Sequence, residues 1–206
     1  MPDAHEVIWD EGVGCARCRN KGVPFDGVVR LGSWEGELRR LVLGLKYSAW
    51  WEVADPLGRL LAMRMRPLLG WVQQPACIVP MPMPLLRRWT RGLDHAALLA
   101  SSMGRGLGLP VRPLLTMKHG VLQARSTRSV RRRMGQHRVQ FRHRRLFSPD
   151  LKSFQGSTIV LVDDVMTTGS TAFVAAKRLR SLNPRRLFLA VAAVSDGGDV
   201  DPARRP

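Results

Sequence analysis

The chain alternates short apolar runs with longer segments in which apolar residues recur every three or four positions. The first pattern is typical of strands buried on both faces, and the second of helices with one face on a core. Strands that alternate with helices predict a parallel α/β sheet flanked by helices. The expected strands are residues 27–31, 75–80, 111–115, 159–162 and 186–194, and the expected helices are 35–47, 50–69, 91–107 and 172–177.

Residues near the helix ends predict where two of the helices start or stop. Asp55 and Pro56 form a typical N-cap and first-turn pair for the main part of the second helix. Gly108 followed by Pro110 is expected to end the third helix. The residues expected to face the core are Leu38, Leu41, Val42 and Leu45 in the first helix, Leu57, Leu60, Leu61, Met65 and Leu68 in the second, and Leu93, Ala97, Leu98 and Met103 in the third.

The clearest chemical signal is the junction between the strand at 159–162 and the helix after it. Asp163 and Asp164 follow the strand directly. Small hydroxyl residues and Gly let backbone N–H groups converge on an anion, and the helix N-terminus adds further donors. Carboxylates accept hydrogen bonds from ribose hydroxyls, and they hold Mg²⁺ together with substrate phosphates. The junction therefore predicts a ribose phosphate site, with the phosphate on Val165, Met166, Thr167, Thr168, Gly169, Ser170 and Thr171. An ordinary strand end with a solvated acidic turn is the alternative.

This run resembles the phosphoribosyl pyrophosphate signature of the type I phosphoribosyltransferases, and the chain as a whole resembles the narrower ComF family. The resemblance implies a type I phosphoribosyltransferase-like fold, a Rossmann-type parallel sheet flanked by helices. It also implies displacement at the anomeric carbon of phosphoribosyl pyrophosphate, with Asp163 and Asp164 as the catalytic carboxylates. The landmarks that carry it, in order, are Cys15-Ala16-Arg17-Cys18, Leu45-Lys46-Tyr47, Val79-Pro80-Met81-Pro82, Arg87-Arg88, Arg91-Gly92, the segment from Gln123 to Arg133, and the signature itself.

Pyrophosphate contacts are also implied by the resemblance. Guanidinium groups suit phosphate because their planar forks donate paired hydrogen bonds. In the segment from Gln123 to Arg133, which resembles a flexible loop of the family, Arg131 and Arg132 would close over the pyrophosphate as a lid. The alternative for Lys46 is a cation that complements a helix C-terminus. The alternative for the loop Val79-Pro80-Met81-Pro82 is a surface turn. The residues assigned to pyrophosphate are Lys46, Pro80, Met81, Arg87, Arg88, Arg91, Arg131 and Arg132.

Two departures from the family pattern bear on function. The chain has Leu93-Asp94-His95 where the family usually has Phe-Asn-Gln, so an acid and an imidazole replace two amides. Ser126 and Met134 stand where Leu and Asn are common. These changes, with the charge of the chain, keep a rival hypothesis open: a catalytically inactive basic adaptor of this fold that binds nucleic acid or a competence partner.

Cys15 and Cys18 form one Cys-x-x-Cys pair, which supplies half of a tetrahedral zinc site. Family members usually carry two pairs. Either the first pair lies upstream of Met1, or zinc has been lost, or His5 and an acid complete a poor site; a redox pair is a further option. Cys77 starts an apolar strand and is expected to be a buried small hydrophobe. We expect residues 1–24 to be a truncated or degenerate zinc-ribbon-like segment, 25–195 the phosphoribosyltransferase-like domain and 196–206 a disordered tail.

The composition of the chain limits the classes of partner that it is expected to bind. The 206 residues include 33 Lys and Arg against 16 Asp and Glu, a net charge of +17 that attracts polyanions. Much of it lies in residues 123–145. Only Phe141 within this segment and Phe147 just after it interleave with these charges, so base stacking has little support there. The family association adds single-stranded DNA and competence-machinery proteins as partners. With no long apolar run, no leader pattern and only three Cys, we expect a cytoplasmic protein without a membrane span. No motif identifies the acceptor or the oligomeric state.

Overall fold

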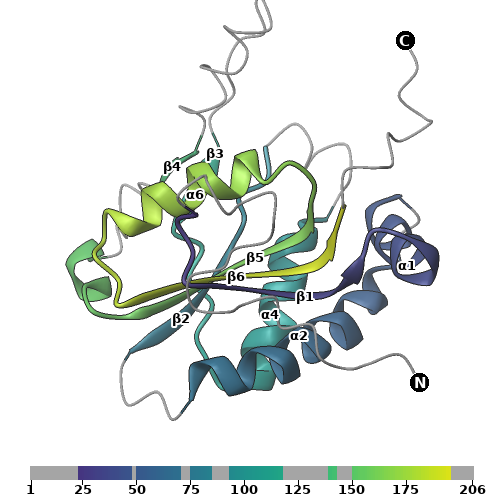
Figure 1. Cartoon of the computed structure of the whole chain (residues 1–206), viewed down its shortest axis with the longest axis horizontal. Helices are drawn as coiled ribbons and strands as arrows, with labels where there is room; N and C mark the ends of the chain where they lie inside the picture. Colours follow the sequence, from purple (N-terminus) through teal and green to yellow (C-terminus); the bar gives the residue numbers. More distant parts are fainter. Residues whose placement is uncertain are drawn as a thin grey trace, which may run out of the picture.

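The computed structural model describes residues 23–47, 50–70, 75–84, 93–117, 139–142 and 150–195. These residues form a parallel α/β sheet with helices on both faces, as predicted (Figure 1). The strands are β1 (Gly27–Ser33), β2 (Ala76–Pro80), β3 (Leu115–Met117), β4 (Val139–Phe141), β5 (Thr158–Met166) and β6 (Arg186–Val194). The helices are α1 (Gly36–Tyr47), α2 (Ala54–Leu69), α4 (His95–Leu107) and α6 (Ser170–Arg180), with short 3-10 helices η1 (Trp51–Val53) and η2 (Leu151–Phe154).

The main sheet has the strand order β1-β6-β5-β2, and all of its neighbouring strands are parallel. β3 and β4 form a separate antiparallel pair. Because parallel strands share a direction, their carboxyl ends meet at one edge of the sheet. Figure 1 shows α1 at that edge, beyond the arrowheads of β1 and β6.

Both faces of the sheet are buried, which explains why its strands read as continuous apolar runs. Ile159 and Leu161 of β5 face a core that includes residues of α6, β3 and β4. Val160 and Val162 face the opposite way, into a core shared with α1, α2 and α4. Figure 1 shows the same arrangement, with α6 on one side of the sheet and α2 and α4 on the other.

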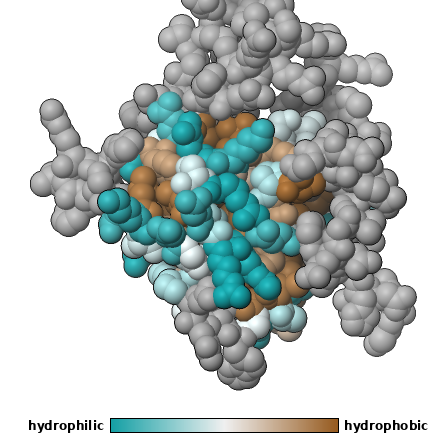
Figure 2. Space-filling model, turned by 60° about the vertical axis from the view of Figure 1, so that its left-hand side comes forward, coloured by the Kyte–Doolittle hydropathy of each residue, from teal (hydrophilic) through white to brown (hydrophobic). Residues whose placement is uncertain are grey.

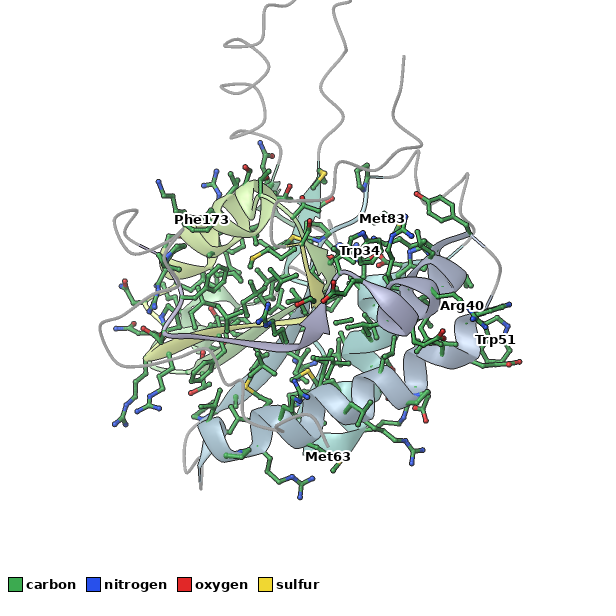
Figure 3. All side chains as sticks on the ribbon, turned by 45° about the vertical axis from the view of Figure 1, so that its right-hand side comes forward. Trp34, Arg40, Trp51, Met63, Met83 and Phe173 are labelled. Carbon is green, nitrogen blue, oxygen red and sulfur yellow. The ribbon has the colours of Figure 1, made fainter. Side chains whose placement is uncertain are left out.

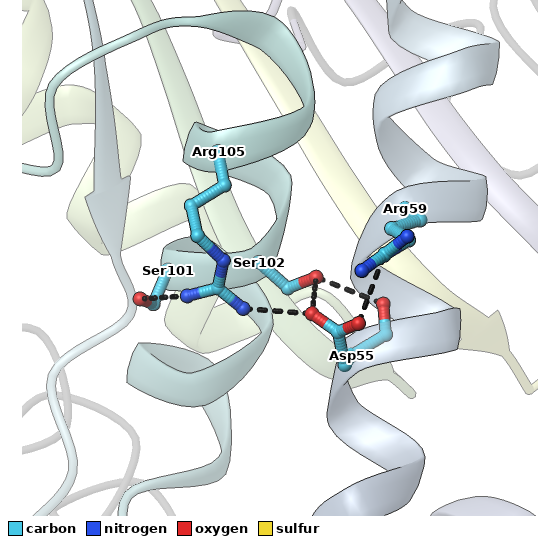
Figure 4. A network of polar contacts seen from close by, with 5 residues as sticks. All are labelled: Asp55, Arg59, Ser101, Ser102 and Arg105. Carbon is cyan, nitrogen blue, oxygen red and sulfur yellow. Dashed lines mark hydrogen bonds and ion pairs between the residues drawn. The ribbon is translucent and has the colours of Figure 1, made fainter.

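Two helix starts differ from prediction. α2 begins at Ala54 with Val53 as its N-cap, so the expected Asp55–Pro56 cap is wrong. The 3-10 turn η1 runs straight into the helix, and the Asp55 carboxylate instead accepts hydrogen bonds from Ser102 and Arg105 of α4 (Figure 4). α4 begins at His95 rather than at Arg91, since the Asp94 side chain caps it by accepting a hydrogen bond from Ala97 N at 3.1 Å.

The later start of α4 also moves its buried face. Ala96, Leu99, Ala100 and Met103 are buried, whereas three of the residues expected to face inward, Leu93, Ala97 and Leu98, are half-buried. In α2 the prediction for Leu60 is wrong, because its side chain is 48% exposed while Leu57, Leu61 and Met65 fill the core. The predicted end of α4 is confirmed: Gly108 has φ 68° and ψ 25°, and its N–H bonds to Gly104 O.

Two strands also differ in extent. β5 does not stop at Val162 but continues to Met166, held by β6 alone beyond the last residue paired with β2. Of the strand expected at 111–115, Val111 makes only a single bridge to Ile78, and β3 starts at Leu115. Residues 1–22 and 196–206, expected to be a zinc-ribbon-like segment and a tail, lie outside the described part of the chain.

The other end of the sheet, where β5 and β6 begin, is polar. Figure 2 views the molecule from this side and shows hydrophilic side chains over much of the described surface. The exposed cations there are Lys152, Lys177, Arg178, Arg185 and Arg186. Within the described ranges, no helix is both long and apolar enough to cross a membrane.

Candidate functional site

Two adjacent carboxylates lie at the carboxyl edge of the sheet, in the part of β5 that extends past β2. The backbone N–H of Asp164 donates to Asp163 Oδ1 at 2.8 Å. Asp164 Oδ2 lies 3.1 Å from Lys46 Nζ at the end of α1, and these two side chains are only 14% and 16% exposed. The same ammonium lies 5.5 Å from the ring centroid of Trp34 (Figure 3), a cation–π distance. Lys46 is therefore positioned by both a charge and a ring.

The pKa of Asp163 is far from its ordinary value. Burial first, and then the neighbouring charge of Asp164, raise the pKa of Asp163 to about 8. The Asp164 N–H and the Lys46 ammonium act in the opposite direction without reversing the shift. At neutral pH Asp163 therefore keeps its proton when no further cation is near. The described residues therefore supply Asp163 and Asp164 with less positive charge than two ionised carboxylates require.

A third acid, Asp94, also acts on Asp163. It caps α4 at this edge, and its charge contributes to the raised pKa of Asp163. In the sequence, Asp94 stands out only as a departure from the family pattern. Its part in the site was missed because the helix was expected to start upstream of it, although Asp is a favoured N-cap residue.

The loop after β5 leads directly into α6. Gly169, the N-cap of α6, has φ 72° and ψ −2°, and a Cβ there would lie 3.3 Å from the Phe173 ring. The positive φ therefore favours glycine at this position, and a Cβ would be in tight contact with the ring. Thr168 Oγ1 and Ser170 Oγ are 3.0 Å apart. The hydroxyl residues Thr167, Thr168, Ser170 and Thr171 are all exposed, beside the N-terminal N–H groups of α6. An anion fits this combination of hydroxyls and helix N-terminus.

The loop after β2 lies beside the carboxylates. Met81 N donates to Val162 O at 2.8 Å, one position beyond the paired strand. Pro80 and Met81 are buried, so their side chains belong to the core and only their backbone is available to a ligand.

Of the residues predicted for pyrophosphate, the structure brings Lys46, Pro80 and Met81 to this edge. Cys77 is 4% exposed, and burial raises the pKa of its thiol to about 11, which confirms its prediction as a buried hydrophobe. The remaining candidates, Arg87, Arg88, Arg91, Arg131, Arg132, Cys15 and Cys18, lie outside the described residues.

The carboxylates fit Mg²⁺ by their chemistry. Mg²⁺ is usually held by one or two carboxylates together with substrate phosphates, not by a cage made of protein alone. Within the described residues, no group of three His, Cys, Asp or Glu is placed to hold a metal ion. Asp163 and Asp164, with a phosphate supplied by the ligand, would provide the necessary oxygens.

Comparison with known proteins gives the family. The phosphoribosyl transferase domain model matches residues 96–203, more than half of the chain. The DNA utilization protein YhgH of Escherichia coli K12 is 31% identical over 175 residues, which cover 80% of this chain and 70% of YhgH. Competence protein F of Haemophilus influenzae is 28% identical over 171 residues, covering 82% of this chain and 72% of that protein. The chain belongs to the ComF family of phosphoribosyltransferase-like proteins.

A solved structure is also similar. The purine phosphoribosyltransferase from Pyrococcus horikoshii is 17% identical, with a TM-score of 0.46 over 84% of this chain and 83% of that one. The family assignment rests on the domain match and the relatives above. The match at 96–203 includes β5, the loop after it and α6.

Proposed function

We propose that the protein binds phosphoribosyl pyrophosphate, or a related ribose phosphate, together with Mg²⁺ and transfers the phosphoribosyl group to an acceptor. The observation that carries this proposal is the carboxylate pair Asp163–Asp164. It has a single described cation partner, Lys46, and it lies directly before an exposed hydroxyl loop at a helix N-terminus. A ligand with ribose hydroxyls, phosphates and a divalent cation would match each part of that arrangement.

Each half of the site would hold one part of the ligand. Asp163 and Asp164 would accept hydrogen bonds from the ribose hydroxyls and bind Mg²⁺. The run from Met166 to Thr171 would hold the 5′-phosphate through its hydroxyls and the first N–H groups of α6. Gly169 lets the backbone turn sharply between strand and helix.

Lys46 would have two partners in turn. In the free protein it pairs with Asp164. If Asp164 held Mg²⁺, the Lys46 ammonium would be able to turn to the pyrophosphate of the ligand. In the free protein this ammonium also contacts the Trp34 ring. Lysine suits this role because its flexible stem carries a compact point charge.

In the transfer, the bond between the anomeric carbon and a pyrophosphate oxygen breaks and a bond to the acceptor forms. The sugar gains positive charge as this happens, as in glycoside chemistry. Lys46 and the arginines predicted for the pyrophosphate would stabilise the departing group, and Mg²⁺ would supply further positive charge there. The acceptor gives up its proton to solvent, since no described side chain has been assigned as a base.

The relatives favour a biological setting. They are named for DNA utilization and for competence, so we propose a role in DNA uptake, carried out in the cytoplasm. The rival is an adaptor of this fold that binds partners without turnover. The departure at Asp94 and His95 supports it, because an extra acid beside Asp163 makes the site more negative.

The test is calorimetric binding of phosphoribosyl pyrophosphate with and without Mg²⁺. The proposal expects Mg²⁺-dependent heat for the wild type and none for Asp163→Asn/Asp164→Asn. Asp55→Asn is the matched control, since it makes the same chemical change in a folded cluster away from the site. No heat from folded wild-type protein would overturn the proposal. Release of pyrophosphate in the presence of candidate acceptors then separates an enzyme from a protein that binds without turnover.

A further inference from the structure

One face of α1 carries a cation and two aromatic rings in a row. Arg40, Gly44 and Tyr47 are four and then three residues apart, a spacing that places them on the same side of a helix. The Trp50 ring packs over Gly44 so closely that a Cβ there has no room, and Trp50 N donates to Gly44 O at 3.3 Å. Arg40, Trp50 and Tyr47 therefore follow one another along the helix, and Trp51 comes next in η1.

These aromatic side chains are exposed to an unusual degree. Tyr47 is 67%, Trp50 43% and Trp51 55% exposed. Large aromatic residues usually bury most of their area, and exposed ones are typical of binding surfaces. Figure 3 shows Trp51 projecting into solvent at the same outer edge as Arg40. We call Arg40, Tyr47, Trp50 and Trp51 the aromatic row.

The charge around the row favours a polyanion. α1 carries Arg39, Arg40 and Lys46 against the single carboxylate of Glu37. Lys46 is held by Asp164, and Arg40 lies 3.2 Å from Glu37 in a pair whose side chains are 70% and 77% exposed. Such an exposed ion pair is weak, so Arg39 and Arg40 remain able to contact a phosphate. The chain as a whole carries a net charge of +17. This charge opposes the pairing of two copies of the protein through this face. Rings that are exposed next to a guanidinium are how proteins bind single-stranded nucleic acid, because every base can stack on an aromatic face.

The spacing favours a single strand over a duplex. Gly44, which lies under the Trp50 ring, and Tyr47 are three residues apart in α1, a rise of about 4.5 Å. Bases of a duplex strand are only about 3.4 Å apart along the axis. The rings would therefore receive bases that have been drawn apart from one another.

The row also borders the candidate site. Tyr47 directly follows Lys46, and the Lys46 ammonium contacts Asp164. We propose that the aromatic row binds single-stranded nucleic acid by stacking its bases, on a path that leads to the carboxyl edge of the sheet. This proposal goes beyond the ribose phosphate site, and it places the stacking residues outside the arginine-rich segment 123–145.

The test is fluorescence anisotropy with a labelled oligothymidylate longer than the ~4–16 nucleotides that one binding module usually covers. Tyr47→Ala/Trp51→Ala should raise the Kd about tenfold or more, because two stacking rings are lost. Tyr47→Phe/Trp51→Phe keeps both rings and should bind like the wild type. Arg40→Gln should weaken binding and lower the slope of log K against log salt by at most about 0.7. Glu52→Gln removes an exposed carboxylate next to Trp51 and should tighten binding.

Leu60→Ala/Met63→Ala is the control for loss of exposed apolar area. Leu60 and Met63 are 48% and 67% exposed on α2, as exposed as the rings, yet they lie outside the row and should leave the Kd unchanged. Circular dichroism checks the fold of each variant.

Three results would overturn the proposal. The first is no strand binding by the wild type. The second is equal affinity in a folded Tyr47→Ala/Trp51→Ala variant. The third is sedimentation showing a dimer that this variant abolishes, which would make the row a protein interface. None of these depends on Mg²⁺ or on phosphoribosyl pyrophosphate, and Asp163→Asn/Asp164→Asn should bind the strand at least as well as the wild type. Failure here and failure of the ribose phosphate site are therefore distinguishable.

Discussion

Asp55 and Asp163 are two acids in polar clusters with opposite electrostatics. Asp55 lies between α2 and α4, where Oδ1 accepts from Ser102 Oγ at 2.8 Å and from Arg105 at 2.7 Å. Its Oδ2 accepts from Arg59 Nε at 2.8 Å (Figure 4). The Ser102 hydrogen bond and then the two arginines hold the pKa of Asp55 below its usual value of 3.8. Asp163 has one backbone donor and shares one lysine with a second carboxylate, and its pKa is raised to about 8.

The difference separates an acid whose charge the chain itself neutralises from one whose charge it does not. The chain itself supplies every partner that the charge of Asp55 requires, so this residue fastens α2 to α4 and has no capacity left for a ligand. Asp163 is stable as an anion only when more positive charge arrives than the described residues provide. Perturbed acids of that kind cluster at functional sites, and here the missing charge is what a bound divalent cation would bring.

The largest expected effect is on the pH dependence of Mg²⁺-dependent ligand binding. Because Asp163 must lose its proton to bind a cation, the association constant should rise about tenfold per pH unit below pH 8. It should level off above that pH. Calorimetry in two buffers of different ionisation enthalpy measures the released proton directly. The slope is best read above about pH 7, since phosphate groups themselves titrate near pH 6. An affinity that is flat from pH 7 to 8.5 would contradict the raised pKa of Asp163.

The second effect is on stability, and its sign is unusual for an acid. A carboxyl group with a raised pKa favours the folded state at low pH, and that contribution is lost as pH rises from about 4 to about 8. Asp163→Asn keeps an oxygen for the Asp164 N–H and removes the charge. We expect this variant to be more stable than the ligand-free wild type at pH 9, by about 1–3 kcal/mol. Urea unfolding at pH 5 and pH 9 checks this, and the difference between the two proteins should be small at pH 5.

The third effect separates the two roles of Lys46. Lys46→Met keeps the length and apolar stem of the side chain and removes its charge. It should weaken phosphoribosyl pyrophosphate by about tenfold, the scale of one charged hydrogen bond, and ribose 5-phosphate much less. Competition binding of the two ligands measures the ratio. Equal losses for both ligands would mean that Lys46 does not contact the pyrophosphate.

The sequence predicted the sheet because burial on both faces leaves an unmistakable pattern in β2, β5 and β6. It also predicted the acidic strand end and the hydroxyl loop, since these are contiguous in the chain. It did not predict the partners of Lys46, because Trp34 and Asp164 reach it only when α1 packs at the carboxyl edge of the sheet.

Contacts between residues that are distant in sequence also explain why the predicted N-cap of α2 is wrong. Asp55 has the local features of an N-cap, but Ser102 and Arg105 compete for its carboxylate from 47 and 50 residues away. Contacts over that distance cannot be found from spacing. Asp94 could have been found, because an Asp before an apolar helical segment is a local signal.

The smallest expected effect comes from Asp55, whose charge is already paired with Arg59 and Arg105. Asp55→Asn keeps the shape of the side chain and weakens its bonds to Arg59 and Arg105, so it should lower Tm by a few degrees at pH 7. A carboxyl group with a lowered pKa stabilises the folded state above its unfolded pKa, and this contribution disappears on acidification. The difference from the wild type should therefore shrink toward pH 3, whereas the Asp163→Asn difference grows toward pH 9. Thermal unfolding of both variants across this range tests the comparison directly: slopes of the same sign would show that Asp55 and Asp163 do not differ in the way their surroundings imply.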